Sequence, residues 1–342
     1  MSRLKTQNRT LNNASKHITT IILRVLVLSV IIFLVWSQNH LIVSRNYIYS
    51  DNDLPKSFVG YKILHISDIC NTSNNVVSAA KHSEPDIIVL SGGYQDKNGK
   101  YEKTIDIVNK LCNIAPVYYI YNTNDTVDCL SSTQAINITD VGIDLNSGIT
   151  DAATLIEKAY GKKIIDKANK GDTDALQYMQ YINDELINNQ YSTIKICGIS
   201  NMNNASFEDI QKNSYSITGA DKDAFTIMLN GNLANLDSLC STNIDVMLVG
   251  GTFGKSSDIA SCSKGPYSYL GTQLFVSGGC GNYTSKRIAN VPEVQLITLS
   301  DGTIKQNNPI ENFLDLFIDD VGTIYDNDGG FSEYTHKYGL GS

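Results

Sequence analysis

Short runs of apolar residues alternate with stretches of helical periodicity along the middle of the chain. In the first half the runs lie at 62–67, 86–91 and 116–121, with helical patterns at 74–83 and 101–113 between them. Five more runs follow at 193–199, 224–229, 244–249, 272–277 and 294–300. Each run is too short for a helix and is bounded by turn residues. Strands that alternate with helices predict an α/β fold.

Two segments depart from this alternation. Between 151 and 190 apolar residues recur at helical spacing, and Gly-Asp-Thr-Asp at 171–174 interrupts them, which predicts an inserted helical hairpin. Its apolar positions are Leu155, Ile156, Ala159, Leu176, Met179, Ile182 and Leu186. Near the end, residues 310–321 have the apolar face of a helix, and a loose tail follows. We therefore expect a main domain at 59–308 and a C-terminal helix with its tail at 309–342.

A long apolar run precedes the domain. Residues 18–36 contain a single charge, Arg24, and a helix of this length, at about 1.5 Å per residue, spans a bilayer. Residues 1–17 are basic and contain no acid, which predicts a cytoplasmic N-terminus and an extracytoplasmic body, hence a single-pass membrane protein. A cleaved signal peptide is the alternative, but no small-x-small cleavage site follows the run. Residues 37–58 are polar and predict a short stalk.

The charge and the cysteine spacing argue against two classes of protein. The chain has 27 Lys and Arg against 35 Asp and Glu, a net charge of −8, and the part after residue 24 has 22 basic and 35 acidic residues, or −13. This acidic body argues against a nucleic-acid partner. The seven cysteines include no CxxC pair, which argues against a zinc finger. Their spacing leaves pairing open, for example between Cys262 and Cys280.

Glycines and polar residues follow the predicted strands, where open α/β sheets bind ligands. Five blocks carry them, namely YKILHISDICN (61–71), PDIIVLSGGYQD (85–96), APVYYIYNTND (115–125), FTIMLNGN (225–232) and IDVMLVGGTFG (244–254). With the closing segment 274–299, these blocks are similar in order and position to those of calcineurin-like metallophosphoesterases of the membrane-anchored bacterial type. The resemblance covers about Tyr61 to Ser300. It implies a four-layer α/β/β/α sandwich with an N-terminal transmembrane helix.

The resemblance also implies where a dinuclear metal centre would lie. In that family two metal ions activate a hydroxide for attack on a phosphate ester. Asp68 matches the first carboxylate ligand and is the one position kept of eight. The substituted positions are Cys70, Gly93, Thr123, Asn124, Gly231, Gly251 and Phe253. Most of the carboxylates, imidazoles and amides that such metals need are therefore missing.

Few other residues can rebuild the site. The five histidines are at 17, 40, 65, 82 and 336, and none is placed to replace a ligand. Asn124, Asp125 and Cys70 could join Asp68 around one cation, which is one alternative. Another is a lone phosphate site at Lys255, because Gly250 to Ser256 resembles a phosphate-binding loop. That loop has three residues between its glycines, however, where the motif requires four.

These observations favour a membrane-anchored protein with a metallophosphoesterase-like fold that has lost dinuclear catalysis and has a binding or regulatory role. The alternative is an active phosphoesterase that hydrolyses phosphomono- or diesters through a rebuilt site, and only in that case do we expect two divalent metals, Mn, Fe or Zn. A paralogue with no role beyond folding is a third interpretation. The expected partners are the membrane, through residues 18–36, and a protein bound by the helices of 151–190. We expect no other cofactor and no nucleic acid.

Overall fold

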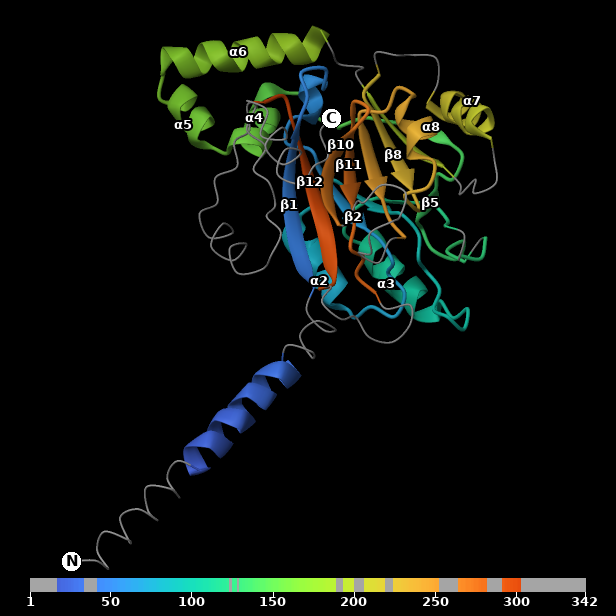
Figure 1. Cartoon of the computed structure of the whole chain (residues 1–342). Coiled ribbons are helices and arrows are strands. Elements are labelled where there is room, and N and C mark those ends of the chain that lie inside the picture. The colour runs from blue at the N-terminus through green and yellow to red at the C-terminus, as the bar shows by residue number, and fades with distance from the viewer. Residues whose placement is uncertain are drawn as a thin grey trace, which may run out of the picture.

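Two six-stranded sheets form the centre of the molecule, and helices cover their outer faces (Figure 1). The computed structural model describes residues 17–33, 42–122, 125–127, 129–188, 193–199, 206–218, 224–251, 264–281 and 291–302. Every structural statement below concerns these residues. The mixed arrangement agrees with the α/β class expected from the alternating pattern.

The first sheet has the strand order β1-β12-β2-β3-β4-β5. Its named strands pair in parallel except for β12 and β2, which are antiparallel. The bounds are Val43–Ser50 for β1, Glu293–Ser300 for β12, Lys62–Ile66 for β2, Ile87–Leu90 for β3, Val117–Tyr119 for β4 and Ile136–Asn137 for β5. The central strands are buried on both faces, so they appear in the sequence as continuous apolar runs.

The second sheet has the order β10-β11-β9-β8-β7-β6. Strands β11, β9, β8 and β7 are parallel, and the two edge strands β10 and β6 pair antiparallel to them. The bounds are Gly265–Tyr269 for β10, Thr272–Val276 for β11, Val246–Val249 for β9, Thr226–Asn230 for β8, Ile194–Ile199 for β7 and Gly142–Leu145 for β6.

Three apolar cores hold the layers together. The largest lies between the sheets, where Ile63 and Val89 of the first sheet share a cluster with Ile227 and Leu248 of the second. A second core joins the outer face of the first sheet to α2 (Asn75–Ser83) and α3 (Glu102–Cys112). A third joins the second sheet to α7 (Phe207–Thr218) and α8 (Leu236–Cys240). The order of layers is therefore helix, sheet, sheet, helix.

The segment predicted as a helical hairpin contains three helices, α4 (Ala152–Tyr160), α5 (Lys163–Asn169) and α6 (Thr173–Asn188), which lie together at one end of the sheets in Figure 1. Gly161, at φ +75°, ends α4, so α4 and α5 are separate helices. Leu155, Ile156, Ile182 and Leu186 lie in the core between the sheets. Leu176 was expected on the same apolar face, but its side chain is exposed.

An ion pair fastens this segment to the first sheet. Nζ of Lys158 lies 2.6 Å from Oδ1 of Asp86 and 4.9 Å from the centre of the Tyr61 ring. The side chains of Lys158 and Asp86 are 22% and 27% exposed, whereas those of Lys162 and Glu157, which also pair, are 72% and 52% exposed. The Lys158 contact is therefore less screened by water.

Substituting Lys158 by methionine should destabilise the protein by about 1 to 2 kcal/mol, because the half-buried ion pair and the cation–π contact are both lost. The apolar stem is retained in this variant. Hydrogen exchange of α4 and urea unfolding would measure the effect. The matched control is Lys162→Met, which removes the exposed pair and should cost less than about 0.5 kcal/mol. Equal losses in the two variants would show that the Lys158 contact does not fasten the segment.

The expected stalk at 37–58 is wrong for its described part. Residues 43–50 form β1, which pairs with β12 along its full length. A short 3-10 helix follows at Lys56–Phe58, and Phe58 is fully buried in the core between the sheets. β1 lacks the continuous apolar run of a central strand, because it is an edge strand in which Tyr47 alone is buried.

Residues 17–33 form a helix, and all of its residues are exposed. It covers most of the apolar run at 18–36, whose last three residues lie outside the described part of the chain. Among the described residues, no helix has both the length and the hydropathy needed to cross a membrane. The expected terminal helix at 310–321 and the tail after it are also outside the described residues.

Candidate functional site

The carboxyl ends of the parallel strands of both sheets meet in one place. Oγ of Ser67, after β2, lies 2.9 Å from Oγ of Ser277, after β11, and so joins the two sheets. The amide of Gly250, after β9, donates to the carbonyl of Asn230 at the end of β8. This is where the resemblance to metallophosphoesterases places the metal ligands.

Gly93, which the resemblance matches to the bridging carboxylate, has no room for a side chain. A Cβ atom at this position would lie 2.5 Å from Cα of Asp68 and 2.6 Å from its Oδ1. The backbone of Gly93 has φ +80°, a conformation that residues with a side chain rarely adopt. Two hydrogen bonds hold the strands at this distance, from the amide of Asp68 to the carbonyl of Gly92 and from the amide of Cys70 to the carbonyl of Gly93, both 2.9 Å.

The other glycines at the strand ends are packed equally closely. A Cβ at Gly231 would lie 2.8 Å from Cβ of Asn122, and one at Gly251 would lie 2.0 Å from the carbonyl oxygen of Gly231. Gly281, after β11, is in the same situation, because its Cβ would lie 2.0 Å from the carbonyl oxygen of Cys70. At Gly251 and Gly281 backbone therefore packs directly on backbone, whereas at Gly231 the nearest atom is Cβ of Asn122.

Asp68, which the resemblance matches to the first carboxylate ligand, is fully buried in this packing. Its backbone is left-handed, with φ +50°, and its carbonyl accepts a hydrogen bond from the amide of Gly281 at 2.6 Å. Oδ2 of Asp68 lies 3.3 Å from Oγ of Ser67. Within the described part of the chain, no group of three His, Cys, Asp or Glu residues is placed to hold a metal ion.

The carboxylate of Asp125 is directed at backbone amides. It accepts hydrogen bonds from the amides of Gly93 at 2.9 Å, Tyr94 at 2.6 Å and Asn122 at 3.0 Å. Burial raises the pKa of Asp125 above its usual value, and these hydrogen bonds act in the opposite direction. The side chain thus fastens the turn after β3 to the turn after β4, which is a structural task.

His65 lies in a buried polar network between the sheets. Nδ1 is 3.1 Å from Oε1 of Gln295, and Nε2 is 2.7 Å from Oγ of Ser91. The amide nitrogen of Gln295 donates to the carbonyl of Val276 at 2.9 Å and to Oε1 of Glu293 at 3.2 Å. Gln295 therefore presents its oxygen to His65, so Nδ1 carries the hydrogen and Nε2 accepts from Ser91. Burial lowers the pKa of His65 to about 4, so the ring is neutral at pH 7.

The structure describes only some of the residues predicted for the site. Cys70 is buried two residues after Asp68. Gly93 lies against Asp68, and Gly251 lies against Gly231. The remaining predicted residues, Thr123, Asn124, Phe253 and Lys255, lie outside the described residues, and so does Cys262.

The sequence interpretation missed the residues that close the site. Asn122 contacts Gly92 and Gly231, and Gly281 covers the loop from Asp68 to Cys70. A signal was present, because Gly-Gly pairs follow three of the strands, at 92–93, 250–251 and 278–279. Glycine at a strand end often marks a close approach of backbone.

Comparisons with known proteins add little to this geometry. No family model matches the chain, and no curated protein matches it. Among solved structures the chain is similar to Vps29 of Chaetomium thermophilum, with 9% sequence identity and a TM-score of 0.30 over 69% of this chain and 83% of that chain. A likeness of this strength does not define a family.

Proposed function

We propose that this chain is a non-catalytic protein on a metallophosphoesterase-like fold, with a binding or regulatory role. The observation that carries the proposal is the contact between Gly93 and Asp68. A Cβ at position 93 would lie 2.5 Å from Cα of Asp68, so the bridging ligand is absent and its place is filled. The order of the motif blocks, each at the end of a parallel strand, supports the fold assignment.

The residues present do not fit a dinuclear metal centre. Two metals need several carboxylate, imidazole or amide ligands directed into one space. Here Gly93, Gly231 and Gly251 contribute none, and backbone carbonyls occupy part of that space. The alternative site with Asp125 is also disfavoured, because its two carboxylate oxygens accept hydrogen bonds from three backbone amides.

We also propose that residues 18–36 anchor the chain in a membrane, with a cytoplasmic N-terminus and an extracytoplasmic body. The sequence supports this, since the run is apolar and a basic tail precedes it. The described part of the run is a helix whose large apolar side chains are exposed. Such a surface needs an apolar environment.

A protein partner of segment 151–190 stays a prediction. The large apolar residues of α4 pack in the core, and so do Tyr178, Met179, Ile182 and Leu186 of α6. Leu176, Tyr181 and Ile187 are the large apolar side chains that α6 leaves exposed, so a partner of this segment would bind there.

The proposal is tested by an assay of phosphoesterase activity. We expect the full chain in a neutral detergent, supplied with Mn²⁺, to hydrolyse nitrophenyl phosphomonoesters and phosphodiesters no faster than the Asp68→Ala variant does. Hydrolysis that requires Mn²⁺ and falls at least tenfold in Asp68→Ala would contradict it and would support the rebuilt metal site.

A further inference from the structure

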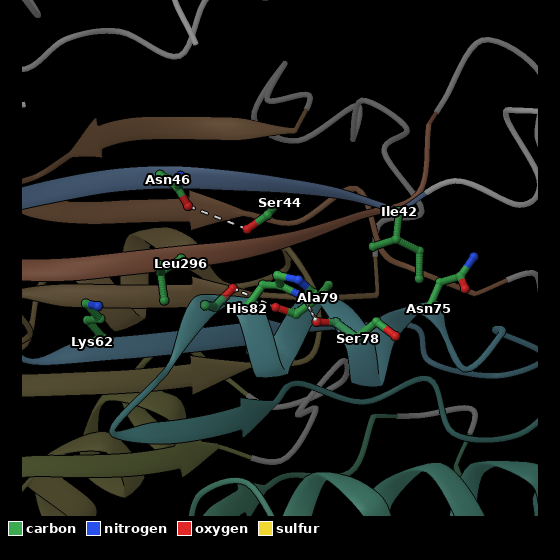
Figure 2. A pocket seen from close by; sticks show the side chains of 10 residues that line it. Ile42, Ser44, Asn46, Lys62, Asn75, Ser78, Ala79, His82 and Leu296 are labelled. Carbon is green, nitrogen blue, oxygen red and sulfur yellow. Dashed lines mark hydrogen bonds between the residues drawn. The ribbon is translucent and has the colours of Figure 1, made fainter. Parts of the chain in front are cut away.

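A groove of about 550 Å³ lies on the outer face of the first sheet, away from the strand ends described above. It is bounded by the edge strand β1 and by α2 (Figure 2). The lining residues are Ile42, Ser44, Asn46, Lys62, Asn75, Ser78, Ala79, His82, Ser83 and Leu296. This volume is within the range of small-molecule sites. The lining contains no carboxylate, although the body of the protein is acidic.

Lys62 is unusual among the lysines of the described chain. Six of these lysines are half-buried, and five of the six have a carboxylate oxygen within 4.0 Å. Lys62 is the sixth, and no ion pair involves it in the described part of the chain. The five paired residues are Lys56, Lys110, Lys158, Lys195 and Lys264. A half-buried cation with no carboxylate partner among the described residues favours an anionic ligand.

Asp86 is near Lys62 in the structure but does not neutralise it. Oδ2 of Asp86 accepts a hydrogen bond from the backbone amide of Lys62 at 2.7 Å, and its Oδ1 pairs with Nζ of Lys158. The neighbouring residue Ile63 lies in the core between the sheets, so the side chain of Lys62 is on the opposite, outer face. The ammonium group is thus directed into the groove and away from Lys158.

The walls of the groove can also bind hydroxyl groups. Nδ1 of His82 lies 2.8 Å from the carbonyl oxygen of Ser78, so Nδ1 carries the hydrogen and Nε2 is an acceptor in the neutral ring. Ser44 and Ser78 add hydroxyls that both donate and accept. Ile42, Ala79 and Leu296 supply apolar surface. Figure 2 shows Lys62 at one end of the groove, with Ile42 and Asn75 at the other.

We propose that this groove binds a phosphorylated polyol, whose phosphate pairs with Lys62 and whose hydroxyls bond to His82 and the serines. A phosphate offers more acceptor oxygens than a carboxylate and suits a site with several donors. This site is independent of the proposed loss of catalysis, because the groove lies on the outer face of the first sheet, away from the strand ends.

The phosphorylated polyol can come from a lipid headgroup or from a soluble compound. Ile42 is six residues after the end of the apolar run at 36. An extended chain of six residues reaches at most about 20 Å, so a membrane anchor would hold the groove near the membrane surface. The test therefore includes a probe of each kind.

Isothermal titration of the full chain in a neutral detergent tests the proposal. The probes are glycerol 3-phosphate, short-chain phosphatidylglycerol, inorganic phosphate and glycerol. We expect at least one phosphorylated polyol to bind, glycerol not to bind, and inorganic phosphate to bind more weakly. Lys62→Ala should weaken binding at least tenfold. The control Lys81→Ala removes an exposed lysine of α2 that does not line the groove and should leave affinity unchanged.

The outcomes separate the sources. Binding of the lipid but not of glycerol 3-phosphate supports a headgroup, and the reverse supports a soluble ligand. Equal affinity for inorganic phosphate overturns the polyol assignment. The whole proposal is overturned if neither phosphorylated polyol binds. It is also overturned if Lys62→Ala and Lys81→Ala weaken binding equally, provided that both variants unfold at the same temperature as the wild type.

Discussion

Replacing Gly93 by alanine should destabilise the protein by about 3 kcal/mol or more. The left-handed backbone at this position costs a residue with a Cβ roughly 1 to 2 kcal/mol. The added methyl group would also lie 2.5 Å from Cα of Asp68, and relief of such overpacking costs about 1 to 3 kcal/mol. Urea unfolding of the variant and the wild type measures the sum.

Gly99 provides a matched control. Its φ is +74°, close to the +80° of Gly93, but no atom lies within 4 Å of a Cβ placed there. Gly99→Ala should therefore cost only the backbone contribution, about 1 to 2 kcal/mol. The difference between the two variants isolates the close contact with Asp68. If the two substitutions lower the free energy of unfolding equally, Gly93 is not closely packed against Asp68. That result would refute the claim that the space at the strand ends is filled.

The same contact predicts what happens when the family's ligand is put back. Gly93→Asp should not create a metal site, because the new carboxylate would enter space that Asp68 already fills, beside the carboxylate of Asp125. Like charges in a buried place add to the steric cost. On the function proposed above, a single substitution at position 93 is therefore not expected to create catalysis.

Stability should fall steeply in mild acid because of His65. Its pKa in the folded state is about 4, whereas the ordinary value is 6.5, so the folded protein favours the neutral ring. The stabilising contribution is therefore fully present above pH 6.5 and is lost as the pH falls from 6.5 towards 4. The difference between the two pKa values corresponds to about 3 kcal/mol.

The variant His65→Gln tests this contribution. Glutamine does not titrate, and it can still hydrogen bond to Ser91 and Gln295. We expect the free energy of unfolding of wild type to drop by about 3 kcal/mol more than that of the variant between about pH 7 and pH 4. His82→Gln removes an exposed imidazole and is the control. Parallel pH profiles for wild type and His65→Gln would show that His65 is not buried as a neutral ring.

Much of the fold could be predicted from the sequence. The strands β3, β8 and β9 are buried on both faces, so they appear in the sequence as apolar runs between turn residues. The edge strand β1 could not be predicted from such runs, because its partner β12 is about 250 residues away in the chain and its outward residues are polar. The middle helix of the insert, α5, was missed because Gly161 divides the helical pattern early.

The site could be predicted only in part. The resemblance to metallophosphoesterases implies that ligands are missing at Gly93, Gly231 and Gly251, because glycine has no side chain. Their close packing does not, since the contact between Gly251 and the carbonyl of Gly231 depends on how neighbouring strands end. The role of Asp125 was likewise hidden, because a carboxylate that holds a turn and one that binds a cation look the same in sequence.

The central claim is that the strand ends no longer hold two metals, and metal content tests it most directly. The full chain in neutral detergent would be equilibrated with Mn²⁺, Fe²⁺ and Zn²⁺ in turn, separated from unbound metal by gel filtration and analysed for metal, beside Asp68→Ala. We predict less than about 0.2 metal ions per chain, with no difference between the two proteins. About two ions per wild-type chain, lost in Asp68→Ala, would contradict the claim and would identify a working dinuclear centre.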